Sequence, residues 1–382
     1  MIDDKIKAAM AEATRLTQAG RFAEATALIQ GVLGAGAAEH WGATASASAQ
    51  DAIEGDFELV DDSSARGTDG AVPQSFDAIP SEPGVRPGVS RGTFTDALGR
   101  RDYRLYRPRR LAERPALLVM LHGCGQDPEA FAQLTRMDDL AEDLGFVVLY
   151  PAQSAAANAS GCWSWYSAEN QDRGAGEPGI LAAMTRHLRD AHRLDPRHVY
   201  VAGFSAGAAM AVTLAVTYPD LFAAVCAHSG LPYGVAGDLI TALSLMAQGP
   251  TGGGVELPDL RPPPIIVFHG DGDPTVSPAN AEALIQQFLP GLAAKEGVAV
   301  GRLDAVRRKG QTDNGLNYLQ IQYKISGGDP LAELWLAQGA GHGWLGGRVS
   351  SPFAEPRGPD ASREMLRFFW SVPCLAGASD ER

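Results

Sequence analysis

The chain has 382 residues, of which 45% are apolar, and its formal net charge is −13 at neutral pH. This apolar content supports a sizeable core, while 44 glycines and 25 prolines indicate many turns rather than an array of helices. The negative charge argues against nucleic acid or an anionic membrane as a partner, and no apolar run reaches the roughly 18 residues of a membrane span.

The chain begins with two predicted helices within residues 1–34. Ile2 and Ile6 recur at helical spacing, Gly20 interrupts the pattern, and Phe22 resumes it. We interpret the segment either as one helical hairpin of the tetratricopeptide type or as an amphipathic hairpin with no specific partner. Because a single unit of this kind cannot bury its own apolar face, we expect it to dock on the rest of the chain or on a partner protein.

Residues 35–90 are poor in large apolar side chains and are predicted to be a low-complexity linker. The segment ends in the pattern Gly-Val-Ser-Arg-Gly, in which Ser90 is the central serine. No strand is predicted before this pattern and no helix after it, so we assign Ser90 to the linker. The remaining domain, residues 91–375, is predicted to begin with a β-hairpin formed by residues 92–95 and 103–106.

Apolar strands then alternate with helices, which indicates a mainly parallel sheet covered by helices on both faces. The functional loops of such a sheet lie at the carboxyl ends of its strands. The predicted strands are Leu117–Leu121, Phe146–Tyr150, Val199–Ala202, Phe222–Ala227, Ile265–Phe268 and Leu334–Ala337, and the predicted helices are Phe131–Leu144, Ile180–Leu194, an alanine-rich helix that stops at Tyr218-Pro219, and Ser362–Trp370.

The strand that begins at Val199 runs into Gly203-Phe204-Ser205-Ala206-Gly207 and then directly into the alanine-rich helix. Glycines two residues before and two residues after the serine allow a sharp turn and keep neighbouring side chains away from its hydroxyl. A strand, a turn of this kind and a helix in succession predict that Ser205 is a nucleophile.

A serine hydroxyl needs an imidazole to take its proton and an acid to orient that imidazole. His342 follows the last predicted strand within Gly-Ala-Gly-His-Gly and is the predicted base. Asp271 and Asp273 both follow the strand that begins at Ile265, and their spacing alone leaves either as the acid. The order Ser205, Asp273, His342 is that of the α/β-hydrolase fold, so we predict this fold together with the N-terminal hairpin and linker.

Three other histidines, His122, His228 and His269, also follow strands. His228 precedes the acid and breaks the expected order, and the other two are expected to hydrogen-bond neighbouring turns. The negative charge that develops on the substrate needs two N–H donors. We predict the backbone N–H groups of Ala206, at the start of a helix, and of Cys124, in the loop after the strand ending at Leu121.

Five motifs in one order carry a family resemblance: LHGCGQD, GCWSWYS followed by GEPG, VYVAGFSAGAAMA, HGDGDPTV with Asn280, and GHGWLGG. Together they resemble the poly(3-hydroxybutyrate) depolymerase-like esterase family, which is related to feruloyl and acetylxylan esterases. The resemblance extends over about residues 93–370. It implies a serine ester hydrolase without a metal or organic cofactor, and it favours Asp273 over Asp271 as the acid.

The four cysteines, Cys124, Cys162, Cys226 and Cys374, show no spacing typical of a zinc site. The family resemblance implies a disulfide bond between Cys124 and Cys162, which would not persist in a reducing compartment. The N-terminus shows no secretory signal, so the cytoplasm is the expected location by default, although relatives are often secreted.

Trp163, Trp165, Tyr166 and Trp344 lie in motifs that are expected to surround Ser205, and we predict that they bind the substrate, with core packing as the alternative. The favoured substrates are short-chain esters and 3-hydroxybutyrate-type oligomers or polyester. Feruloyl or acetyl esters of plant polysaccharide are the alternative, and peptide cleavage or a non-catalytic binding role are further ones. A Gly- and Pro-rich insertion over residues 229–264 is either part of a lid or a surface excursion.

Overall fold

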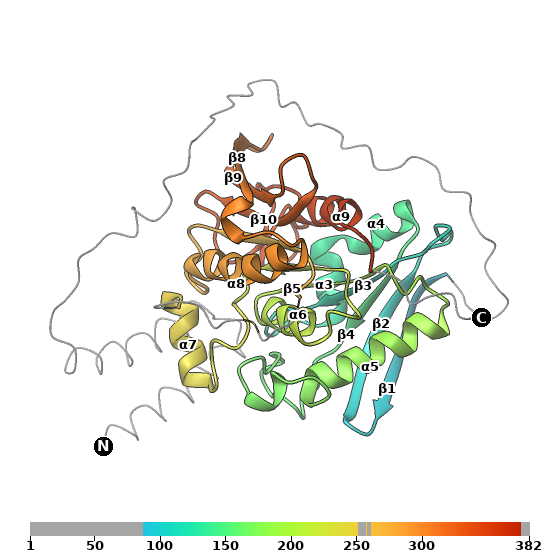
Figure 1. Ribbon diagram of the computed structural model, residues 1–382. Coiled ribbons are helices and arrows are strands. Elements are labelled where there is room, and N and C mark those ends of the chain that lie inside the picture. The colour runs from blue at the N-terminus through green and yellow to red at the C-terminus, as the bar shows by residue number, and fades with distance from the viewer. Residues whose placement is uncertain (1–86, 251–256, 258–260, 376–382) are drawn as a thin grey trace, which may run out of the picture. The chain divides into compact units, whose positions relative to one another are not determined.

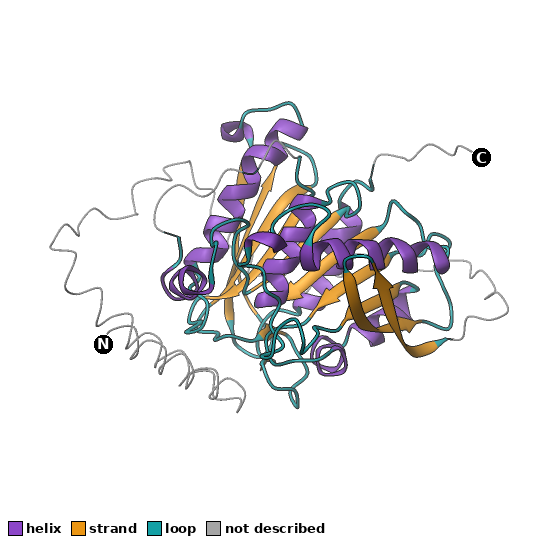
Figure 2. Cartoon of the chain, turned by 90° about the horizontal axis from the view of Figure 1, so that it is seen from below, coloured by secondary structure: helices purple, strands orange, loops and turns teal. Residues whose placement is uncertain are grey.

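The computed structural model describes residues 87–250, 257 and 261–375. These residues form a ten-stranded sheet with helices on both of its faces (Figures 1 and 2). The predicted N-terminal hairpin over residues 1–34 and nearly all of the predicted linker lie outside the described residues.

The strands of this sheet lie in the order β1-β2-β4-β3-β5-β6-β7-β10-β9-β8. The middle strands, from β4 to β10 in this order, are all parallel to one another, and an antiparallel hairpin flanks them at each edge. The strands are β1 Gly88–Asp96, β2 Gly99–Arg107, β3 Leu117–Leu121, β4 Val147–Pro151, β5 Val199–Phe204, β6 Ala224–His228, β7 Ile265–Gly270, β8 Asp304–Gln311, β9 Asn317–Lys324 and β10 Pro330–Ala337. Because β5 lies near the middle, the loops that follow β3, β6, β7 and β10 meet around its carboxyl end.

The sheet buries both faces, as the continuous apolar strands predict. On one face, residues such as Val119 and Val201 pack against α5, Gly176–Ala191, α6, Ala206–Thr217, and α8, Ala279–Lys295. On the other face, residues such as Met120 pack against the helices α3, Pro128–Thr135, α4, Met137–Leu144, and α9, Ala361–Ser371. Alternate residues of one strand therefore belong to different cores.

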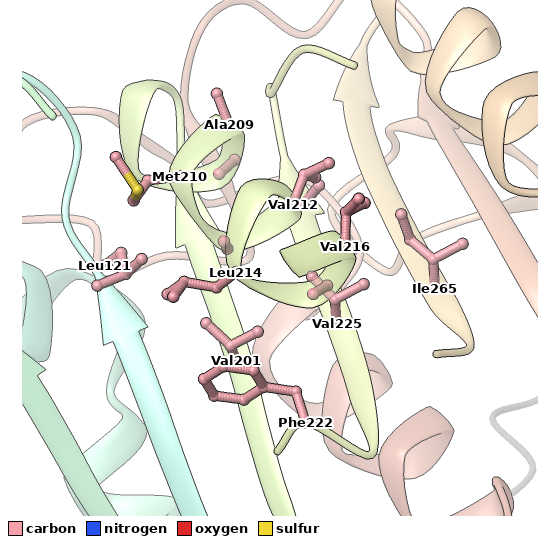
Figure 3. Packing of buried hydrophobic residues seen from close by; sticks show 14 of the residues in the cluster. Leu121, Val201, Ala209, Met210, Val212, Leu214, Val216, Phe222, Val225 and Ile265 are labelled. Atoms are coloured by element: carbon pink, nitrogen blue, oxygen red, sulfur yellow. The ribbon is translucent and has the colours of Figure 1, made fainter. Parts of the chain in front are cut away.

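Helix α6 is buried along its entire length, which explains why its sequence has no polar face. Figure 3 shows that Val201, Val225 and Ile265, from the neighbouring strands β5, β6 and β7, lie against it. Its small alanines allow the helix to approach the sheet closely. The helix that follows Ser205 is thus rigidly packed against the centre of the sheet.

The N-terminal edge of the sheet corrects one prediction. Ser90 lies within β1 and pairs with Leu105 of β2, so it belongs to a strand rather than to the linker that was predicted to end there. The segment Gly88–Gly92 carries almost no apolar side chains, and β1 is largely exposed. Its strand conformation is therefore set by pairing with β2, which a search for apolar runs does not detect.

Two further differences come from local backbone geometry and from an edge. The single helix predicted over Phe131–Leu144 is two helices, α3 and α4, because Arg136 between them has a left-handed φ of 54°. The antiparallel strands β8 and β9 were not predicted. Strand β8 is mostly exposed and rich in charged residues, so its sequence lacks the apolar run of a buried strand.

Candidate active site

Ser205 lies at the turn between β5 and α6 and has the dihedral angles φ 56° and ψ −121°. A positive φ at a residue other than glycine costs about 1–3 kcal/mol and is retained where surrounding contacts impose it. One such contact is the hydrogen bond from the Ser205 N–H to the carbonyl oxygen of His228, at 2.9 Å, which extends the pairing of β5 with β6. The strained residue is therefore the serine itself.

The two glycines around Ser205 are required by close contacts. A Cβ atom at Gly203 would lie 2.1 Å from the carbonyl oxygen of Gly207, and one at Gly207 would lie 2.1 Å from the carbonyl oxygen of Leu121. Neither glycine has a positive φ. They allow α6 to lie directly against the end of β3, which brings the serine close to the loop that follows β3.

Asp273 and His342 are brought together from the loops after β7 and β10. The Nδ1 atom of His342 lies 2.7 Å from Oδ2 of Asp273, whose side chain is fully buried. The other carboxylate oxygen, Oδ1, accepts hydrogen bonds from the backbone N–H groups of Thr275 and Val276, at 2.8 and 2.9 Å. These bonds orient the carboxylate so that Nδ1 of His342 carries a proton and Nε2 is left as a base.

The environment keeps Asp273 ionised. Burial disfavours the carboxylate, but the hydrogen bond from His342 and the nearby imidazoles of His342 and His269 outweigh burial, so the pKa of Asp273 lies below its ordinary value of 3.8. The ring of His342 also packs against that of Phe204, with centroids 4.9 Å apart. This contact places the imidazole beside the residue that precedes Ser205.

The rival acid and the rival histidines occupy other positions. Asp271 is exposed and accepts a hydrogen bond from the N–H of Gly339, so it links the two loops without contacting His342. The Nε2 atom of His269 donates to the carbonyl oxygen of Val276 at 2.8 Å. Asp271 and His269 thus have the contacts of residues that stabilise a turn.

His228 is fully buried and lies beneath the site. Its Nε2 accepts the N–H of Leu345 at 3.0 Å, and its ring stacks on Trp344, with centroids 4.8 Å apart. Burial lowers the pKa of His228 well below its ordinary value, so the ring is neutral at neutral pH. This histidine therefore connects β6 to the segment after His342.

The loop after β3 carries the predicted donor Cys124. The N–H of Gly123 donates to the side-chain oxygen of Gln126 at 2.8 Å, and the carbonyl oxygen of Gly123 is 2.9 Å from Nδ1 of His122. Ala206 occupies the first position of α6, where backbone N–H groups have no partner within the helix. Both predicted donors thus come from segments that converge on Ser205.

A disulfide bond joins Cys124 to Cys162, whose Cα atoms lie 4.2 Å apart. It connects the loop after β3 to the aromatic segment Gly161–Ser167. Among the described residues, Cys226 and Cys374 carry free thiols, the first buried and the second exposed. Within the same part of the chain, no group of three or more His, Cys, Asp or Glu side chains is arranged to hold a metal ion.

The structure corrects the substrate contacts predicted for two tryptophans. Trp163 and Trp344 are both 0% exposed. The indole N–H of Trp163 donates to the carbonyl oxygen of His122 at 3.0 Å, and that of Trp344 donates to the hydroxyl of Ser362 at 3.1 Å. Because both indoles are fully buried, they pack in the core rather than border a cleft.

Trp165 is 6% exposed, and Tyr166, whose ring packs edge-on against it, is half-buried. The side-chain amide of Gln171 donates to the carbonyl oxygens of Trp165, at 3.3 Å, and Ala236, at 2.6 Å. These bonds connect the aromatic segment to the insertion over residues 229–264. A substrate contact at Trp165 or Tyr166 stays a prediction.

That insertion contains helix α7, Leu239–Gln248, of which Leu239 and Ile240 are 42% and 57% exposed. Its carboxyl end is fixed, because the N–H of Ser277 donates to the carbonyl oxygen of Met246 at 2.7 Å. The amide of Asn280 donates to the carbonyl oxygen of Leu245 at 2.9 Å. The apolar helix is thus attached to the loop that carries Asp273.

Comparison with known proteins decides the family. The model of the family described as Esterase PHB depolymerase matches residues 101–314, which is more than half of the chain. The chain belongs to the Esterase PHB depolymerase family. The resemblance predicted from the five motifs is therefore confirmed, and with it the prediction that the chain is a member of a family of carboxylic ester hydrolases.

Named relatives of this esterase family member include poly(3-hydroxyalkanoate) depolymerase C of Paucimonas lemoignei, which is 32% identical over 237 residues. That match covers 59% of this chain and 54% of the depolymerase, so the chain spans about half of that relative's length. Feruloyl esterase B of Thermothelomyces thermophilus is 30% identical over 200 residues, which cover 48% of this chain and 68% of that enzyme.

Among solved structures, an acetyl xylan esterase from Aspergillus awamori has a TM-score of 0.56 and is 23% identical. The match covers 74% of this chain and all of that one, and it confirms the α/β-hydrolase fold predicted for the sheet region. No helix in the described part of this esterase family member has the length and apolar character needed to cross a membrane.

Proposed function

We propose that this chain is a serine carboxylic-ester hydrolase that acts through an acyl-enzyme, with residues 91–375 as its catalytic domain. The observation that supports this most directly is the pair formed by His342 and the buried carboxylate of Asp273, at 2.7 Å. Ser205, held at a positive φ at the end of the central strand, is the third member. The chain order of these residues and the pairing of His342 with Asp273 support acyl transfer.

In the proposed reaction, the Oγ atom of Ser205 attacks the carbonyl carbon of the ester and His342 Nε2 takes the hydroxyl proton. The N–H groups of Cys124 and Ala206 stabilise the oxyanion. His342 then gives its proton to the departing alcohol, and an acyl-serine remains. A water molecule, deprotonated by the same nitrogen, attacks this acyl group and releases the acid, while Asp273 stabilises the positive imidazole throughout.

For the substrate we propose short-chain esters and oligomers of 3-hydroxyalkanoates, in agreement with the name of the Paucimonas relative. The exposed apolar residues Leu239 and Ile240 of α7 supply a surface suited to an apolar chain. Feruloyl or acetyl esters of polysaccharide are the second candidate, because a feruloyl esterase matches over 68% of its own length. Residues 1–34 remain a proposed contact with a partner protein or with the catalytic domain.

The basic test is hydrolysis of p-nitrophenyl butyrate by the wild type and by Ser205→Ala. We expect the variant to retain only a residual rate, and equal rates would show that the proposal is wrong. Labelling of Ser205 by an organophosphonate separates an active site from a non-catalytic binding domain. Turnover of hydroxybutyrate oligomers, amorphous polymer, methyl ferulate, acetylated xylan and a peptide p-nitroanilide then distinguishes the substrate classes.

A further inference from the structure

Glu177 is a buried carboxylate that lies outside the catalytic residues and joins three distant segments. It is 5% exposed and occupies the first turn of α5. Its Oε1 accepts hydrogen bonds from Nη2 of Arg101 in β2, at 3.1 Å, and from the side-chain amide of Gln153, just after β4. Its Oε2 accepts the backbone N–H of Ser164, in the aromatic segment, at 2.8 Å.

Gln153 extends this network toward the loop that carries Cys124. Its side-chain amide also donates to the carbonyl oxygen of Cys162 at 2.8 Å, and its backbone N–H donates to Nε2 of His122 at 3.2 Å. Because Nε2 accepts a hydrogen bond, the proton of the neutral ring is on Nδ1, which donates to the carbonyl oxygen of Gly123 at 2.9 Å. Burial lowers the pKa of His122, which favours this neutral form.

Hydrogen bonds to the Gly123 carbonyl oxygen help to determine where the N–H of Cys124 points. This oxygen accepts the ring N–H of His122 and also the backbone N–H of Gln126, at 3.2 Å. The carbonyl of Gly123 and the N–H of Cys124 belong to one planar trans peptide unit, so they point in opposite directions. Holding the Gly123 oxygen on His122 therefore orients the Cys124 N–H away from His122. A path of hydrogen bonds thus leads from Glu177 through Gln153 and His122 to the proposed oxyanion donor.

We propose that Glu177 and Gln153 are positioning residues that hold the Cys124 N–H in its productive orientation, independently of the Cys124–Cys162 disulfide. This inference rests on the proposed ester hydrolysis. The disulfide and the hydrogen-bond path connect the same two loops, one by a covalent bond that reduction breaks and the other by bonds that reduction leaves intact. Each therefore compensates for loss of the other.

A double-mutant cycle tests this redundancy. Gln153→Leu keeps the approximate volume and removes the three side-chain hydrogen bonds, to Cys162, Glu177 and Ser154, while the backbone bond to His122 stays. Cys162→Ser removes the disulfide. We expect each single variant to lower kcat on p-nitrophenyl butyrate by less than about tenfold. The double variant should lose about 10²–10³-fold, the loss that follows removal of an oxyanion donor. KM should stay within about threefold, because the donor acts mainly in the transition state.

A matched control separates positioning from general stability. Glu333 is also buried, and it accepts hydrogen bonds from Gln320, Gln322 and Arg367. It belongs to β10, four strands away from β3 in the sheet. Glu333→Gln and Glu177→Gln should both lower Tm, but only Glu177→Gln should lower kcat. Equal losses of kcat in the two variants, or a double variant whose loss is only the product of the two single losses, would overturn the proposal.

Two measurements keep the test decisive. If the double variant does not fold, dithiothreitol added to folded Gln153→Leu takes its place, and the same excess loss of kcat is expected. If the wild type and Ser205→Ala hydrolyse the ester equally, the proposed function is wrong. The network is then tested without turnover, by the rate at which dithiothreitol reduces Cys124–Cys162, followed by alkylation and mass measurement. Faster reduction in Gln153→Leu supports the positioning role, and an unchanged rate overturns it.

Discussion

Asp273→Asn is the substitution whose effect the site geometry predicts most sharply. Oδ1 of Asp273 accepts two backbone N–H groups, those of Thr275 and Val276. An asparagine must place its carbonyl oxygen at that position, because its amide nitrogen would face two donors. The amide nitrogen then faces His342 and donates to Nδ1, which moves the ring proton to Nε2. In that tautomer Nε2 cannot accept the proton of Ser205.

The expected loss follows from the tautomer. A serine hydrolase whose histidine is held in the wrong tautomer loses about 10⁴-fold in kcat. At about 1.4 kcal/mol for each factor of ten, this corresponds to roughly 5–6 kcal/mol of activation free energy. The fold should be preserved, because the asparagine has the same shape and keeps both backbone hydrogen bonds.

The assay is steady-state hydrolysis of p-nitrophenyl butyrate at neutral pH, with circular dichroism to check the fold. Asp271→Asn is the matched control, because Asp271 is exposed and contacts Gly339 rather than His342. We expect the control to change kcat by less than about threefold. A folded Asp273→Asn variant within tenfold of the wild type, or a larger loss in Asp271→Asn, would refute the reasoning.

Three further predictions concern stability. Since the pKa of Asp273 is below 3.8 in the folded chain, its stabilising contribution is present above that pH and is lost as the pH falls through the folded-state pKa. The difference in Tm between wild type and Asp273→Asn should therefore shrink in acid, and a difference that does not change with pH would contradict this. Ser205→Gly should be more stable than Ser205→Ala by about 1 kcal/mol in urea unfolding, because glycine adopts a positive φ without strain. Equal stabilities of the two variants would show that the backbone at this position is not strained. Trp344→Phe should lower the unfolding free energy by about 1–3 kcal/mol, because it loses the hydrogen bond to Ser362 and leaves a smaller side chain in the core. KM for p-nitrophenyl butyrate should change little, and a large rise in KM would show that Trp344 contacts the substrate.

The central strands and the turn at Ser205 could be predicted from sequence because their signals are local. Strand β3 matches the predicted Leu117–Leu121, and β5 and β7 extend the predicted strands by two residues each. Because these strands are buried on both faces, their sequences are unbroken apolar runs. The edge strands β1 and β8 lack such runs, since most of their residues face solvent.

The roles of the aromatic and acidic residues could be assigned only from the tertiary structure. An indole has the same sequence signature whether it borders a cleft or fills a core, and only burial separates the two for Trp163 and Trp344. Glu177 occurs in a recognisable Gly-Glu-Pro-Gly segment, but its importance lies in donors that are 76, 24 and 13 positions away along the chain. No local pattern contains that information.

By itself, the sequence determined that a strand, a tight turn with Ser205 and a helix follow one another, and that an acid and a histidine come later at strand ends. Spacing alone left Asp271 and Asp273 open and the family resemblance favoured Asp273, but only the tertiary structure shows which carboxylate contacts His342. The choice depends on how closely the loops after β7 and β10 approach each other, since His342 contacts Asp273 while Asp271 contacts Gly339. Such a contact joins residues about 70 positions apart, and it arises only when parallel strands bring their carboxyl ends to the same edge of the sheet.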